Sequence, residues 1–253
     1  MLSSKAIYLE MLGRNMDAKI VLDELWKYSP SPLVPVVLSA YEAKTSVLIQ
    51  FRLYEEALLV ANEGLDIAIN NKFLDRVLEL WTLLGKTYLL LNNYDKAEEC
   101  LYYALDLRVP VKRLKRESLV IATYTELAKL YHKIGEYRKS EEYFHKALAT
   151  GEITNNSRRH VEALHEYEKT LIMWNRPKDA VLHLSLADKL CDESKFIRKR
   201  EEVLFDLSNA YLQFDMKMHI KILERKHQIQ LILKQEEVEG GVTMRVGDPP
   251  EGG

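Results

Sequence analysis

Lysine and asparagine side chains recur at a regular spacing in this sequence. Lys86, Lys129, Lys169 and Asn209 follow one another at intervals of 40 to 43 residues. An ammonium group pairs with a carboxylate, and a primary amide hydrogen-bonds a peptide backbone, so this column suits an extended peptide. The alternative is that these side chains are merely solvated faces of helices. The residues expected to flank the peptide are Thr82, Thr125, His132, His165, Phe205 and Gln213.

Histidine and cysteine residues show no spacing typical of catalysis or metal binding. His160 and His165 are five residues apart, so they do not share a helix face as a zinc pair four residues apart would. There is no phosphate-binding glycine loop, no G-x-S-x-G and no Cys–His arrangement. Cys100 and Cys191 fall on expected helices and suggest small apolar side chains in a reducing compartment. We therefore expect a protein that is not an enzyme and uses no metal or cofactor.

Helical hairpins are expected to position the column. The clearest one runs from Trp81 to Leu107 and is broken at Asn92-Asn93. Large residues on its first helix can pack around small ones on its second, where the backbones approach closely. The spacing W-x2-L-G-x2-Y…A-x3-L-x2-A resembles the tetratricopeptide (TPR) repeat. It is formed by Trp81, Leu84, Gly85, Tyr88, Tyr94, Ala97, Leu101 and Ala104.

The hairpin pattern repeats with a nearly constant period. One residue of each second helix marks the register at intervals of 39 to 43 residues: Ala18, Ala57, Ala97, Ser140, Ala180 and Ile220. This predicts an all-α fold, a right-handed α-solenoid of about six TPR-like hairpins over residues 1–236. First helices line the concave face of a solenoid, so the register turns the lysine column towards one hollow. The expected hairpins are 1–28, 33–71, 73–108, 113–150, 157–193 and 196–236.

Composition limits the other function classes. A net charge of −2 gives no bulk attraction to nucleic acid or to an anionic membrane. The first residues do not form a basic segment followed by an apolar run, so no signal peptide is predicted. No apolar stretch approaches the roughly 20 residues that cross a bilayer. We expect a cytoplasmic protein without a membrane partner.

Basic residues gather where the first helices are expected to begin. They are Arg76, Arg116, Arg158, Arg159, Arg198, Lys199 and Arg200. Cations at helix N-termini oppose the helix dipole, which suggests a use such as binding an acidic partner. The alternative function is therefore a constitutive scaffold for protein assembly. The simpler explanation of the basic edge is pairing with nearby acids, namely Asp75, Glu117, Glu162, Glu201 and Glu202.

The last expected helix, Lys217 to Glu236, is apolar on more than one face. One face must pack on its own hairpin, and a second copy of the chain would cover the other, giving a homodimer. Cover by the chain's own tail is the alternative. Residues 237–253 are rich in Gly and Pro, so we predict a flexible tail that does not continue the helix. One apolar face of the last expected helix carries Met218, Ile222 and Ile229, and the other carries Ile220, Leu223 and Leu231.

The register also resembles the TPR regions of bacterial peptide-pheromone receptors of the RRNPP group (Rap, Rgg, NprR, PlcR and PrgX types). The repeats are near 40 residues rather than about 34, and the TPR signature is clear only in the third and fourth copies. The resemblance implies quorum sensing, with a short peptide on the concave face and asparagines clamping its backbone. Only Asn209 stands at such a position here. The group's N-terminal effector is not visible, so we expect a sensor portion that would reach DNA only through an effector outside this chain.

Overall fold

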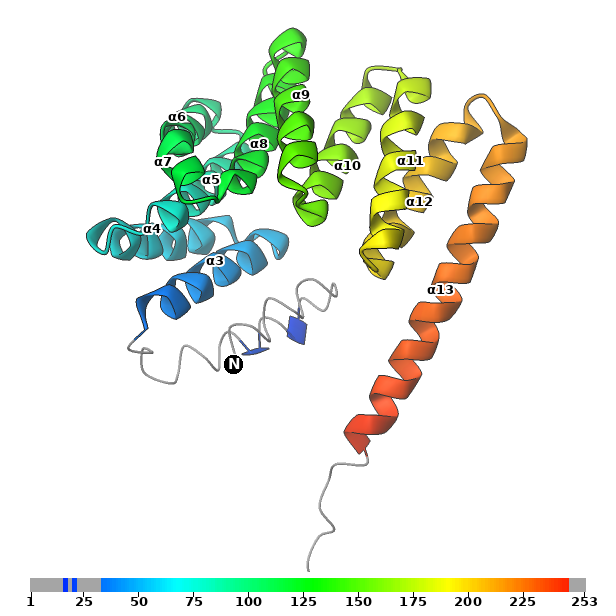
Figure 1. Ribbon diagram of the computed structural model, residues 1–253, viewed down its shortest axis with the longest axis horizontal. Coiled ribbons are helices and arrows are strands. Elements are labelled where there is room, and N and C mark those ends of the chain that lie inside the picture. Colours follow the sequence, from blue (N-terminus) through cyan, green and yellow to red (C-terminus); the bar gives the residue numbers. More distant parts are fainter. Residues whose placement is uncertain (1–15, 18–19, 22–32, 246–253) are drawn as a thin grey trace, which may run out of the picture. The chain divides into compact units, whose positions relative to one another are not determined.

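The computed structural model describes residues 16–17, 20–21 and 33–245, and no strand occurs within these ranges (Figure 1). The all-α prediction is confirmed, as is the succession of TPR-type hairpins. Contacts divide the chain into two compact units, Met1–Ala163 and Leu164–Gly253. The expected first hairpin, with its marker Ala18, falls almost entirely outside the described residues.

The first unit is built from helices that pack against their neighbours in chain order. Val34 and Leu74 begin successive first helices forty residues apart, which reproduces the period of the sequence. The elements are α3 (Val34–Gln50), α4 (Tyr54–Asn70), α5 (Leu74–Leu90), α6 (Tyr94–Asp106), α7 (Arg108–Arg113), the 3₁₀ turn η1 (Glu117–Leu119), α8 (Val120–Lys133) and α9 (Tyr137–Thr154).

Small residues allow the helices of a hairpin to approach. A Cβ on Gly85 would lie 2.6 Å from Cγ of Leu101, so α5 and α6 could not pack this closely around a larger side chain. The markers Ala57, Ala97 and Ser140 have no exposed surface. Neighbouring first helices are joined by a buried hydrogen bond of 2.8 Å between the hydroxyls of Thr82 on α5 and Thr123 on α8.

The second unit repeats the arrangement. Its hairpins use the C-terminal part of α10 (Ser157–Met173), then α11 (Pro177–Glu193), α12 (Ile197–Leu212) and α13 (Met216–Arg245). Ser157 and Ile197 again begin first helices forty residues apart. The rings of Tyr167 on α10 and His183 on α11 lie 4.9 Å apart. The core of this unit contains Leu171, Ala180, Leu184, Leu204 and Leu207.

Residues with a left-handed backbone close most helices. After α3, the Arg52 N–H donates to the Ile49 carbonyl and the Leu53 N–H to the Leu48 carbonyl, which caps the last turn. Such a backbone costs a residue with a side chain about 1–2 kcal/mol, which the capping bonds offset. These residues are Arg52, Lys72, Asn92, Lys115, Gly135, Asn155, Asn175 and Lys195.

Two expectations for the last hairpin are wrong. Ile220 is 51% exposed, so the sixth marker does not lie between the two helices. The helix also continues past Glu236 to Arg245. Gly240 and Gly241 weaken a helix by about 1 kcal/mol each but remove no hydrogen bond, and the first proline of the tail lies beyond them. Residues 246–253 lie outside the described part, so a flexible tail there stays a prediction.

The insertion between the third and fourth hairpins is helical. Its residues form α7 and η1, and the side chain of Val111 is completely buried. Both Cys100 and Cys191 are buried, and burial raises the pKa of their thiols to about 11 and about 12. The thiols therefore remain protonated at neutral pH and pack as apolar groups. No described helix is both long and apolar enough to span a membrane.

Candidate functional site

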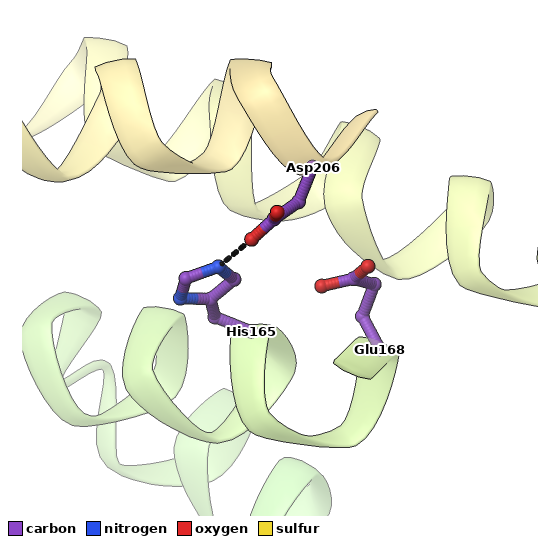
Figure 2. Close-up of side chains that lie close together, drawn as sticks. All are labelled: His165, Glu168 and Asp206. Atoms are coloured by element: carbon purple, nitrogen blue, oxygen red, sulfur yellow. Dashed lines mark hydrogen bonds and ion pairs between the residues drawn. The ribbon is translucent and has the colours of Figure 1, made fainter. Parts of the chain in front are cut away.

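A histidine and two carboxylates converge in the second unit (Figure 2). His165 and Glu168 project from one face of α10, and Asp206 projects towards them from α12, the first helix of the next hairpin. Nε2 of His165 lies 2.5 Å from Oδ2 of Asp206. One ligand-type atom from each of the three residues lies within 4.8 Å of the other two. Of the described residues, only these form such a group of three.

The cluster is buried, and several of its polar atoms have no partner. Glu168 has no exposed surface, and neither of its carboxyl oxygens is hydrogen-bonded. His165 is 2% exposed, and its Nδ1 is also without a hydrogen bond. Burial raises the pKa of Glu168 to about 8, with a further contribution from Asp206. Burial lowers the pKa of His165, although its hydrogen bond to Asp206 opposes the shift.

The repeat register shows how unusual Glu168 is. It precedes Lys169 of the lysine column, and the equivalent residues of the other hairpins are small and buried: Thr45, Gly85, Ala128 and Ser208. A glutamate at this position places a carboxylate where the fold otherwise packs helices closely. Glu168 is therefore visible in the sequence as a break in the register of small residues, whereas the spacing of the histidines does not reveal it.

Asp206 is available to His165 because of a change in the next hairpin. At the equivalent positions, Glu126 pairs with Lys129 at 3.0 Å and Glu166 pairs with Lys169 at 3.1 Å. The sixth hairpin has Asn209 in place of the lysine, so Asp206 has no lysine three residues later and bonds His165 instead. The side chain of Asp206 is 25% exposed, so the cluster is open to solvent on the side of this residue.

The lysine column carries less free charge than its sequence suggests. Lys129 and Lys169 are each paired with the glutamate three residues earlier. Lys86 has Leu83 at that place, is half-buried, and forms no ion pair with the described residues. Asn209 is half-buried on α12. Lys86 and Lys129 lie in the first unit, and Lys169 and Asn209 lie in the second. A shared hollow for the four side chains stays a prediction.

The flanking residues divide into buried and exposed groups. Thr82, Thr125 and His165 are buried, and both threonine hydroxyls donate to the carbonyl four residues earlier. Phe205 takes the equivalent position in the sixth hairpin and is 48% exposed. The two remaining predicted residues are more open. His132, whose pKa burial lowers, lies against Tyr137, and Gln213 lines a shallow depression of about 380 Å³ at the α10–α11 turn.

The basic edge is largely neutralised by acids. In the first unit, Arg76 pairs with Glu42 at 2.6 Å and Arg159 pairs with Glu79. Arg158 pairs with Glu162 at 3.2 Å. In the second unit, Lys199 pairs with Glu202 at 2.7 Å, and Arg200 pairs with both Asp188 and Asp192.

Comparison with known proteins identifies the repeats. The tetratricopeptide repeat family matches residues 78–108 and residues 123–157, the third and fourth hairpins. These are the two copies in which the sequence signature is clearest. Curated protein sequences contain no significant match to the chain.

Solved structures extend the likeness over most of the chain. BtubC from P. vanneervenii is 14% identical, with a TM-score of 0.63 over 96% of this chain and 94% of that one. A Rap protein complexed with Competence and Sporulation Factor is 14% identical, with a TM-score of 0.62 over 93% of this chain and 75% of that one.

A third likeness is to a signal-transduction ATPase from Pyrococcus horikoshii that has a tetratricopeptide repeat sensor. It is 21% identical, with a TM-score of 0.56 over 95% of this chain and 37% of that one. At these identities the likenesses concern the fold. Together with the two matched repeats, they show that the chain contains tetratricopeptide repeats and that its fold resembles that of the Rap protein.

Proposed function

We propose that this protein is a non-enzymatic, cytoplasmic sensor that binds a short linear peptide on the face formed by its first helices. Solenoids of this type bind their ligands along such a face. The Rap protein whose fold is similar is itself complexed with Competence and Sporulation Factor, which supports a sensor of the quorum-sensing type. In that role the chain would pass peptide binding on to a transcription regulator.

The observation that carries the proposal is the state of Lys86. The residue is half-buried on α5 and its ammonium group has no acidic partner among the described residues, whereas Lys129 and Lys169 are neutralised within their own helices. A cation without an acidic partner favours binding of an anion. A peptide carboxylate at Lys86 would supply that charge, and its backbone would then run along α5 and α8.

A selection experiment tests this function. Linear hexapeptides with free carboxyl ends are selected against the full chain, and the affinity of the best binder is measured by calorimetry for the wild type and for Lys86→Ala. We expect a loss of about tenfold to a hundredfold, because a charged hydrogen bond contributes roughly 1.5–3 kcal/mol. Lys133→Ala is the matched control: it removes an exposed lysine from α8 and should leave the affinity unchanged.

Two outcomes would reject the peptide proposal in favour of the scaffold. One is that no hexapeptide binds. The other is that a selected peptide binds Lys86→Ala as tightly as the wild type but is lost in Arg158→Glu, which reverses a charge on the basic edge.

The same proposal includes a homodimer through the last hairpin. Ile222 and Ile229 of α13 are buried, whereas Ile220, Leu223 and Leu231 on its other side are 39% to 51% exposed. An apolar stripe of this kind favours a second copy of the chain as its cover. A monomeric mass in sedimentation equilibrium would remove the dimer and leave the peptide site untouched.

A further inference from the structure

The cluster of His165, Glu168 and Asp206 lacks a positive charge that its burial calls for. Glu168 has no exposed surface and no hydrogen bond to either carboxyl oxygen, and the nearest side chains of the cluster are an imidazole and a second carboxylate. Burying a carboxylate without a hydrogen bond or a cation is costly. Folding alone does not require this glutamate, because the equivalent positions of the other hairpins hold small residues.

The lysines near the cluster do not supply that charge. The ammonium group of Lys169 lies 3.1 Å from Glu166, and that of Lys199 lies 2.7 Å from Glu202. Both pair with acids on their own helices, and neither hydrogen-bonds Glu168, although their charges lower its pKa from a distance. The oxygens of Glu168 therefore have no hydrogen-bonded cation among the described residues.

The atoms that converge are those that bind a transition-metal ion. His165 and Glu168 are three residues apart on α10, so they share a helix face, and Asp206 faces them from α12 (Figure 2). Imidazole nitrogen and carboxylate oxygen both bind Zn²⁺ at about 2.0–2.2 Å. Ligand atoms within 4.8 Å of one another can reach that geometry with small side-chain rotations. The exposed edge of Asp206 gives the ion a path of entry.

We propose that His165, Glu168 and Asp206 bind a divalent transition-metal cation of the zinc class. The imidazole nitrogen distinguishes this site from a calcium or magnesium site, since those ions prefer oxygen ligands alone. Nε2 of His165 would give up the proton that it donates to Asp206 and bind the metal, and the neutral imidazole would then carry its proton on Nδ1. Three protein ligands leave a fourth position for water or a ligand group.

The consequence is a cross-link between two successive hairpins. Glu168 and His165 belong to the fifth hairpin and Asp206 to the sixth, so the cation would join α10 to α12. Metal binding to the folded chain alone raises its stability according to the free metal concentration. This inference does not depend on the peptide proposal, because neither Lys86 nor Lys129 takes part.

The test uses the full chain without an affinity tag, stripped of metal by a chelator and then titrated with Zn²⁺ in a calorimeter. We expect one equivalent to bind and to raise the Tm. Glu168→Gln and Asp206→Asn should each weaken binding by tenfold or more. The controls Glu224→Gln and His227→Gln, which change exposed side chains on α13, should bind as the wild type does.

Two results would overturn the metal site. One is that the folded, stripped wild type shows no saturable Zn²⁺ binding; the other is that Glu168→Gln binds Zn²⁺ as tightly as the wild type. If either cluster variant fails to fold, the absorption spectrum of the wild type with Co²⁺ decides. Bands of a site with one imidazole and two carboxylates support the proposal, and the spectrum of hydrated Co²⁺ refutes it.

Discussion

Glu42 in the first unit and Glu168 in the second are both largely removed from solvent, but only Glu42 has a cationic partner. Glu42 on α3 is 17% exposed, and Arg76 on the next first helix pairs with it at 2.6 Å. Glu168 on α10 has no exposed surface, and the next first helix presents Asp206, another acid. The first unit thus provides its own counter-charge, and the second unit does not. A buried charge that the protein leaves unpaired indicates a ligand, whereas a paired one indicates structure.

Removing Arg76, the counter-charge of Glu42, tests whether this ion pair stabilises the first unit. Arg76→Leu should destabilise the protein by about 2–3 kcal/mol at pH 9, because it leaves a nearly buried carboxylate unpaired and the original pair is only partly exposed. Urea denaturation measures the change. Arg138→Leu removes an arginine whose side chain is 95% exposed and should cost less than about 0.5 kcal/mol. Equal losses in both variants would contradict the role assigned to Arg76.

Glu42 makes the stability of the protein depend on pH, as does Glu168, whose pKa is also raised to about 8. Burial raises the pKa of Glu42 from 4.5 to about 8, Glu79 and Asp75 add to the shift, and Arg76 opposes it. The folded state therefore holds a proton that the unfolded state has lost between about pH 4.5 and pH 8, so this contribution to stability falls as pH rises through that window. Arg159 is not free to add a further opposing charge, since it pairs with Glu79.

Glu42→Gln removes this titrating group. We expect the variant to lose about 1–2 kcal/mol less stability than the wild type between pH 6 and pH 8, as measured by urea denaturation at each pH. Parallel pH profiles for the two proteins would show that Glu42 titrates in the folded state as it does in the unfolded chain.

Methionine substitutions at Glu168 and at Glu42 should change the stability in opposite directions. In metal-free protein, Glu168→Met should raise the free energy of unfolding by about 1 kcal/mol, because it replaces an unpartnered buried carboxyl by an apolar group of similar volume. Glu42→Met should lower it by about as much, since Arg76 then loses its partner. The measured quantity is the sign of the change in the free energy of unfolding that each substitution causes. A change of the same sign for both substitutions would show that the two sites are equivalent.

The hairpins could be predicted from the sequence, because their cause is local. Small residues at Ala57, Ala97 and Ser140 recur at the period that close helix packing requires, and each is fully buried. The predicted break at Asn92 is a turn with a left-handed backbone, and Gly135 and Asn175 take the same backbone, which Asn and Gly tolerate. Arg52 and Lys72 take the same backbone without such a signal, so capping bonds rather than residue type decide it there.

The pairing of charges could not be predicted, because it depends on contacts between hairpins. The sequence placed Lys129 and Lys169 in one column but did not reveal that Glu126 and Glu166 neutralise them. The register predicts His165 as a groove residue but does not predict its partner Asp206, which lies 41 residues further along the chain. The register, applied to the small residues as well as the lysines, would have identified Glu168.

The most direct test of the peptide-binding account is hydrogen exchange of the protein with and without its selected hexapeptide. We expect the peptide to slow exchange in the first helices α5 and α8, which carry Lys86 and Lys129, and to leave the second helices α4, α6 and α9 unchanged. Protection confined to the second helices, or to the segment around Arg158, would contradict the account.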